Sequence, residues 1–175
     1  TVIINGAMWG QCDSIYTAFA VLAFWLVLSK RPKLSMICMA ISFGFKLQAI
    51  FIMPIFLVML FAKKIKFRHY FIFPLTYLVL ILPAVLLGRP FVKTLTLYLS
   101  QTDSIGTGLN YNSPSIFALV SGDVSTDALS AVGIAAAFLF VIAILVWAWV
   151  RRDNLKNEAL LGIAILFVVG IPLLL

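Results

Sequence analysis

Charged side chains are scarce in this chain of 175 residues: only 11% of the residues are charged, whereas 63% are hydrophobic. Ordinary soluble domains are roughly 45–50% apolar and about 25% charged. A soluble helix bundle of this size would leave much of its apolar surface in contact with water. The composition therefore excludes an ordinary soluble protein and indicates an integral membrane protein.

Cysteine and histidine are also rare, with two cysteines and one histidine. Cys12 and Cys38 lack metal-type spacing, which argues against a zinc site. One is expected at a membrane edge and the other inside a helix, so no disulfide is predicted. His69 lies in a basic run, which predicts a solvated cytoplasmic side chain and not a metal ligand or a catalytic base. No cofactor is identified, and no carboxylate cluster supports a divalent metal.

Long apolar runs are the dominant feature of what remains. A run of twenty residues, 131–150, has about the length that a bilayer core requires. The charge-poor stretches together predict an all-α, multi-pass transmembrane helical bundle. They comprise residues 14–29, 34–62, 70–88, 131–150 and 159 onward.

Positive charge is distributed unevenly between the loops. Residues 30–33, 63–68 and 151–158 hold ten of the thirteen Lys and Arg. Because short basic loops face the cytoplasm, these three loops are predicted to be cytoplasmic. Residues 1–13 and an outer loop, 89–130, are then predicted to lie on the extracytoplasmic side.

This orientation requires the stretch 34–62 to turn back within the membrane. Both of its flanks are basic, yet a single helix of this length would span roughly 45 Å and leave on the other side. Two short helices, 34–45 and 49–62, with a bend near Lys46 satisfy the charge pattern. Such a bend is accepted in a protein-lined or wet cavity and not in lipid. One long tilted helix, with one basic loop misassigned, is the alternative.

Lys46 is a candidate site residue because a lysine at membrane depth is costly and marks function by default. Its ammonium suits a phosphate, and Gln48 offers an amide for a phosphate or a sugar hydroxyl. Alternatively, Lys46 reaches the outer headgroups or pairs with a carboxylate such as Asp13.

Arg89 ends the third apolar stretch on the predicted outer side. Its guanidinium can bind a lipid phosphate bidentately, or it can anchor the chain among the headgroups. Residues 90–101 carry a partial helical pattern that predicts an interfacial helix. Further along the outer loop, Asn110, Tyr111 and Asn112 suit sugar hydroxyls, and they are equally typical of turns.

The segment before the first apolar run combines Trp9, Gln11 and Asp13. Asp13 can cap the helix that follows and favours its N-terminal dipole. Capping leaves Trp9 and Gln11 unexplained, however. An aromatic platform, an amide and an acid at a membrane edge are typical of a sugar-binding site.

Two stretches carry a family resemblance: "WGQCDSIYTAF" at residues 9–19 and "FKLQAIFIMPIFLVMLF" at residues 45–61. They resemble bacterial integral membrane glycosyltransferases of the GT-C superfamily, in the mannosyltransferase-like group related to dolichyl-phosphate-glucose-dependent enzymes. The resemblance implies inverting transfer of a hexose from a polyprenyl-phosphate sugar to a lipid-linked or cell-envelope glycan. It also implies a bacterial cell membrane and the outer face, which agrees with the charge count.

The resemblance also bears on the site residues. The family places its catalytic carboxylate in the first outer loop near the chain start, so the base is expected before Thr1 or at Asp13. Lys46, Gln48, Arg89, Trp9 and Gln11 are then expected to bind the donor's phosphate or sugar. Some members of the family use a divalent metal.

The expected organisation is a single membrane domain, 1–175, forming the central or C-terminal part of a larger protein. The expected partners are the sugar donor, the glycan acceptor and membrane lipids, without nucleic acid. The main alternative function is a transporter or flippase for a lipid-linked or anionic substrate, which would also use broken helices and buried charge. A structural subunit of a membrane complex explains the spans but leaves Lys46, Gln48 and the outer loop without a role.

Overall fold

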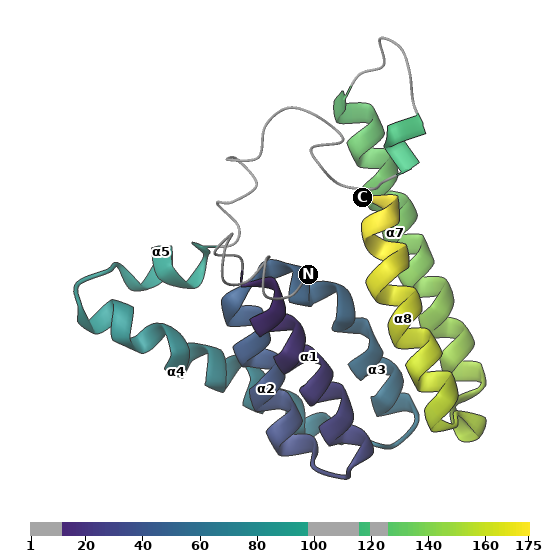
Figure 1. The fold of residues 1–175 in the computed structure, drawn as a ribbon, viewed down its shortest axis with the longest axis horizontal. Helices are drawn as coiled ribbons and strands as arrows, with labels where there is room; N and C mark the ends of the chain where they lie inside the picture. The colour runs from purple at the N-terminus through teal and green to yellow at the C-terminus, as the bar shows by residue number, and fades with distance from the viewer. Residues whose placement is uncertain (1–11, 98–115, 120–125) are drawn as a thin grey trace. The chain divides into compact units, whose positions relative to one another are not determined.

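The structure is a computed structural model that describes residues 12–97, 116–119 and 126–175 (Figure 1). All of its described elements are helical, which confirms the all-α class. Within the described residues, three helical stretches are long and apolar enough to cross a membrane: Phe67–Leu86, Ala128–Val150 and Asn157–Leu174. The elements, in chain order, are α1 (Asp13–Leu28), α2 (Pro32–Phe45), η2 (Leu47–Ile52), α3 (Pro54–Phe61), η3 (Phe67–Phe71), α4 (Ile72–Leu86), α5 (Phe91–Leu95), η5 (Ile116–Leu119), α7 (Thr126–Val150), η6 (Arg152–Asn154) and α8 (Asn157–Leu174).

The described residues form two compact units. Unit 1 contains residues 12–50 and 63–97, and therefore α1, α2, η3, α4 and α5. Unit 2 contains residues 51–62, 116–119 and 126–175, and therefore α3, α7 and α8. The short helix α3 thus belongs with the C-terminal helices, although it follows α2 in the chain.

In unit 1, α1 and α2 form an antiparallel pair joined by a tight turn. The turn is a Schellman motif, in which the amide of Arg31 donates to the carbonyl of Leu26 and that of Lys30 to Val27. Lys30 has a φ of 60°, in the left-handed region that glycine usually occupies. Pro32 then occupies the first turn of α2, where its missing N–H costs nothing.

Hydroxyl groups tie α2 to the backbone of α1. The Ser35 hydroxyl donates to the carbonyl of Ala23 and the Ser42 hydroxyl to that of Tyr16, each at 2.6 Å. Both serine side chains are fully buried. A buried hydroxyl must be hydrogen-bonded because leaving it unpaired is costly, so these two bonds fix the register of the helix pair.

The stretch 34–62 is broken where the charge pattern required it. The helix α2 ends at Phe45, and Lys46 has extended backbone with φ −155° and ψ 133°. The chain continues as the 3₁₀ helix η2 and then as α3, which begins at Pro54. The alternative of one continuous helix is therefore wrong.

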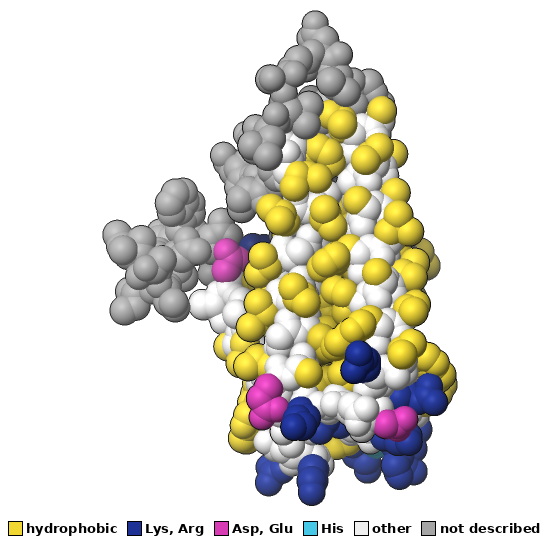
Figure 2. All heavy atoms as spheres, turned by 90° about the vertical axis from the view of Figure 1, so that its right-hand side faces the viewer, with side chains coloured by type: hydrophobic (Ala, Val, Ile, Leu, Met, Phe, Trp, Pro, Cys, Tyr) yellow, Lys and Arg dark blue, Asp and Glu magenta, His cyan; other side chains and the backbone are white. Residues whose placement is uncertain are grey.

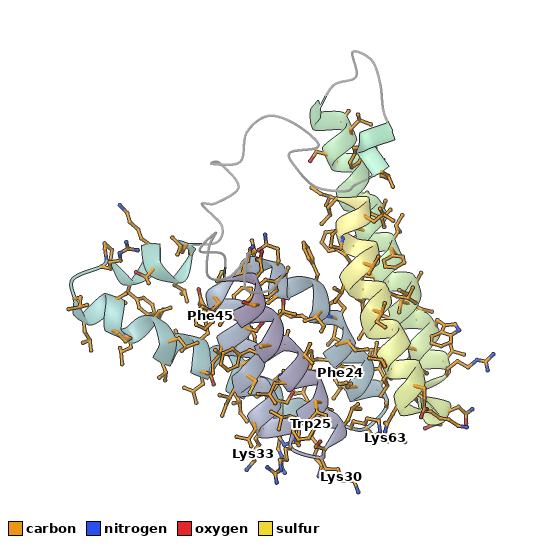
Figure 3. The ribbon with its side chains drawn as sticks, viewed as in Figure 1. Phe24, Trp25, Lys30, Lys33, Phe45 and Lys63 are labelled. Carbon is orange, nitrogen blue, oxygen red and sulfur yellow. The ribbon has the colours of Figure 1, made fainter. Side chains whose placement is uncertain are left out.

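The two basic loops of unit 1 lie at the same end. Lys30, Lys33 and Lys63 extend from that end, whereas Phe45 lies at the opposite one (Figure 3). The helix η3, which follows Lys63, packs against α2, which follows Lys30. The chain that leaves this end at Lys33 has thus returned to it by Lys63, as the predicted hairpin requires.

The prediction that His69 is solvated is wrong. Its side chain is only 7% exposed, and its Nδ1 accepts a hydrogen bond from the backbone N–H of Lys66 at 3.3 Å. The imidazole thereby pairs the backbone N–H of the residue that precedes η3. The basic run around it suggested exposure, but this local bond turns the ring inward.

In unit 2, apolar side chains cover α7 and α8 along their length (Figure 2). Both helices pack against α3. The ring of Phe61 in α3 meets the Trp149 ring of α7 edge-to-face, with 5.0 Å between centroids. The Arg152 guanidinium lies 4.4 Å from the same Trp149 ring, at the charged turn that joins α7 to α8.

Candidate functional site

Asp13 is the first residue of α1, at the end of unit 1 opposite the basic loops. The N-cap residue is Cys12, whose side chain makes no capping hydrogen bond. The interpretation of Asp13 as the cap is therefore wrong, although a carboxylate in the first turn still favours the helix dipole.

The carboxylate of Asp13 forms an ion pair and a hydrogen bond with the ammonium of Lys46. The side chains are 35% and 25% exposed, respectively, so the pair is half-buried and still accessible. The ammonium also lies 5.7 Å from the centroid of the Tyr16 ring, within the range of a cation–π contact. The structure thus shows the pairing with Asp13 that was the alternative to a phosphate contact for Lys46, between residues 33 positions apart in the chain. A phosphate contact of Lys46 stays a prediction.

The break after α2 places Lys46 beside Asp13. The Cys12 thiol donates a weak hydrogen bond to the carbonyl of Phe45, with 3.6 Å between sulfur and oxygen. The rings of Phe19 and Phe45 stack with 6.2 Å between centroids. These contacts hold the start of α1 against the end of α2, while the extended backbone at Lys46 directs its side chain toward Asp13.

The Asp13–Lys46 pair has donors and acceptors that a ligand could use. A lysine ammonium has three N–H donors and one positive charge, and the bond to Asp13 uses one of those donors. The ammonium can therefore bind an incoming oxyanion, and the carboxylate can accept a proton once Lys46 turns toward that anion. Group transfer to a hydroxyl requires a proton acceptor and a cation that stabilises the leaving anion, and a carboxylate beside an ammonium has the chemistry for both.

The remaining predicted residues near the pair are only partly placed. Gln48 is exposed and lies in η2, two residues beyond Lys46. Trp9 and Gln11 lie outside the described residues, as do Asn110, Tyr111 and Asn112. Their proposed contacts with sugar hydroxyls stay predictions.

Arg89 lies at the end of α4, where a second Schellman motif ends the helix. The amide of Gly88 donates to the carbonyl of Val85 and that of Arg89 to Ala84. Gly88 has a φ of 96°, which side chains rarely adopt, so glycine suits this position. Pro90 is the N-cap of α5, a short helix within the segment 90–101, and its interfacial position stays a prediction.

Arg89 lines a cavity of about 430 Å³. Its described lining residues all come from one segment: Arg89, Pro90, Lys93, Thr94, Thr96 and Leu97. Asp13 and Lys46 are not among them. The structure therefore brings Asp13 and Lys46 together and places Arg89 with Lys93, so a cavity shared by all three residues stays a prediction.

Sequence reasoning did not identify Tyr16 as a neighbour of Lys46 or Lys93 as a partner of Arg89. For Arg89 and Lys93 the sequence carried a signal, because two cations four residues apart suggest one anionic ligand. The only sequence signal for Tyr16 was its position one helical turn after Asp13. Among the described residues, no cluster of three or more His, Cys, Asp or Glu could hold a metal ion.

Comparison with known proteins identifies the family of the chain. No curated protein and no solved structure matches the chain significantly. The sequence model of Glycosyltransferase family 87 matches residues 2–175, nearly the whole chain. Together with three helices that can cross a membrane, this match shows that the chain belongs to Glycosyltransferase family 87, a family of membrane glycosyltransferases.

Proposed function

We propose that this glycosyltransferase takes a hexose, with mannose the first candidate, from a polyprenyl-phosphate donor on the extracytoplasmic face of a bacterial cell membrane. The acceptor is a lipid-linked or cell-envelope glycan. The observation that carries the proposal is the half-buried Asp13–Lys46 pair at the end of unit 1 opposite the basic loops. Because basic loops face the cytoplasm, the pair belongs to the outer half of the membrane, where a lipid-linked donor can reach it.

The proposed reaction is a single displacement with inversion. The acceptor hydroxyl oxygen attacks the anomeric carbon, and the bond from that carbon to the phosphate oxygen breaks. Asp13, the candidate base, takes the hydroxyl proton, while the polyprenyl phosphate leaves as an anion. Lys46 turns from Asp13 to this phosphate and stabilises the developing charge. The donor's arrival thus frees the carboxylate that the reaction needs.

The donor class is tested by reconstituting the full-length protein in liposomes with a glycan acceptor. Radiolabelled polyprenyl-phosphate hexose and the corresponding nucleotide sugar are supplied in separate reactions. Labelled product is expected only from the lipid-linked donor. Transfer from the nucleotide sugar, with none from the lipid-linked donor, would overturn the proposal.

The roles of the two residues are separated by conservative variants. Lys46→Arg is expected to retain part of the transfer rate because the charge remains while the geometry changes. Asp13→Asn should impair transfer more than Asp13→Glu, since only glutamate retains a proton acceptor. Lys66→Ala, at the basic end of unit 1, is the matched control and should transfer at the parental rate. Equal rates for Asp13→Asn and Asp13→Glu would argue against Asp13 as the base.

A further inference from the structure

The segment 89–97 carries an anion-binding feature distinct from the Asp13–Lys46 pair. Arg89 and Lys93 line the same cavity of about 430 Å³, and both side chains are exposed. No ion pair within the described part of the chain involves either cation. The sequence also contains no Asp or Glu between Asp13 and Asp103. Two cations therefore line the cavity, and none of its described lining residues is acidic.

The hydroxyl groups that line the cavity already donate to the backbone. The Thr94 hydroxyl donates to the carbonyl of Pro90 at 3.0 Å, and the Thr96 hydroxyl to that of Val92 at 2.8 Å. The side-chain donors left for a ligand are the guanidinium of Arg89 and the ammonium of Lys93. A guanidinium binds two phosphate oxygens at once, and an ammonium adds a compact charge beside it.

The surroundings of the cavity are apolar and exposed. On α5, Phe91 is 49%, Val92 67% and Leu95 38% exposed. Directly before the cavity, Leu86 and Leu87 are 77% and 89% exposed, at the end of a helical stretch long enough to cross the membrane. Cations beside exposed apolar side chains at the end of a span fit the boundary between headgroups and acyl chains.

We propose that Arg89 and Lys93 form a binding site for the phosphate of an anionic membrane phospholipid. The apolar side chains of α5 insert among the acyl chains, and the two cations hold the headgroup from the side. The site anchors α5 to the membrane surface at the end of α4 opposite η3. This inference does not depend on the proposed function, because it concerns a bulk lipid and uses neither Asp13 nor Lys46.

The test uses the full-length protein in nanodiscs that contain photoreactive phosphatidylglycerol with its reactive group near the headgroup. Cross-linked peptides are identified by mass spectrometry. Label is expected on the peptide that contains residues 89–97. Excess unlabelled phosphatidylglycerol should displace it, and phosphatidylcholine should not. Label that is absent from this peptide in the parental protein would overturn the proposal.

Variants relate the labelling to the two cations. Arg89→Gln with Lys93→Gln removes two charges worth about 1 kcal/mol each at a membrane surface, so labelling should fall by roughly thirtyfold. Arg89→Lys with Lys93→Arg keeps both charges and should retain most of the label. If the double glutamine variant does not fold, each single glutamine variant should still lose labelling by roughly fivefold. Unchanged labelling in folded glutamine variants would contradict the proposal.

A further competition separates the two sources of lipid phosphate. Unlabelled polyprenyl phosphate is added in place of phosphatidylglycerol at the same concentrations. Displacement by phosphatidylglycerol at the lower concentration supports a phospholipid site. Displacement by polyprenyl phosphate alone would assign the cavity to the sugar donor and overturn the phospholipid assignment, while leaving the proposed transferase reaction intact.

Discussion

The two units of this protein hold their helices together by different means. In unit 1, polar groups join α1 to α2: Ser35 and Ser42 bond to backbone carbonyls, and Asp13 pairs with Lys46. In unit 2, glycines allow α7 and α8 to approach each other closely. A Cβ atom on Gly133 would lie 2.7 Å from the carbonyl oxygen of Leu174, and one on Gly170 would lie 2.6 Å from the Phe140 ring.

The difference between the units is consistent with the proposed site in unit 1. Polar groups within a membrane protein are costly and are retained mainly where they have a partner or a function. The serine bonds of unit 1 set a register, whereas the ion pair lies half-exposed and can meet a ligand. The described side chains of unit 2 instead provide close packing, which is how transmembrane helices associate without a hydrophobic driving force. Unit 1 is thus expected to control transfer and unit 2 to control stability.

The largest expected effect concerns topology, in which both units should present their basic ends to the cytoplasm. With Cys12 and Cys38 replaced by serine, Lys93→Cys should react with a membrane-impermeant maleimide added outside cells. Lys66→Cys in unit 1 and Asp153→Cys in unit 2 should react only after the membrane is opened. External labelling of Lys66→Cys would mean that unit 1 has the opposite orientation in the membrane. External labelling of Asp153→Cys alone would mean that the basic ends of the two units do not face the same side.

The next largest effect is expected from adding a methyl group where two helices of unit 2 approach closely. Gly133→Ala places a methyl group against the backbone of Leu174 and the ring of Phe117, which should cost about 1–3 kcal/mol of unfolding free energy. Gly162→Ala is the matched control because no described atom outside its own stretch of helix lies within 4 Å of the new Cβ. Unfolding in mixed detergent micelles measures both variants, and equal stabilities would refute the close contact at Gly133.

A smaller loss is expected from each serine of unit 1. Ser35→Ala and Ser42→Ala each remove one buried hydrogen bond, worth about 0.5–1.5 kcal/mol. The two positions lie seven residues apart and share no partner, so the double variant should lose the sum of the two. The same micelle unfolding measures these losses, and stabilities at the parental value would show that the bonds do not hold α2 against α1.

The smallest expected effect concerns Tyr16, whose ring lies beside the ammonium of Lys46. Removing a cation–π contact costs about 0.5–1 kcal/mol. Tyr16→Leu should therefore raise KM for the donor roughly two- to fivefold. Tyr16→Phe keeps the ring and should retain the parental KM. A phenylalanine variant as weak as the leucine variant would assign the effect to the hydroxyl instead.

Much of the fold could be predicted from the sequence because its signals are local. Hydropathy located α4, α7 and α8 to within a few residues, and the basic flanks of 34–62 required the break at Lys46. Contacts between distant residues were harder to predict. The ion pair was one of two alternatives for Lys46, and the contact with Tyr16 depends on a helix register that buried serines set. The close approaches of Gly133 and Gly170 depend on which helix faces meet, which composition does not specify.

The central claim is that Asp13 and Lys46 act as one unit in sugar transfer, and a double-mutant cycle tests it most directly. Asp13→Ala, Lys46→Ala and the double variant of the full-length protein are compared in liposomes, with folding checked separately and Lys66→Ala as the control. Each single variant removes a charge-assisted contact worth about 1.5–3 kcal/mol, so kcat/KM should fall about ten- to hundredfold. The kcat/KM of the double variant should be no lower than that of the less active single variant, because the two side chains are in contact. Folded variants that all transfer sugar at the parental rate would contradict the account.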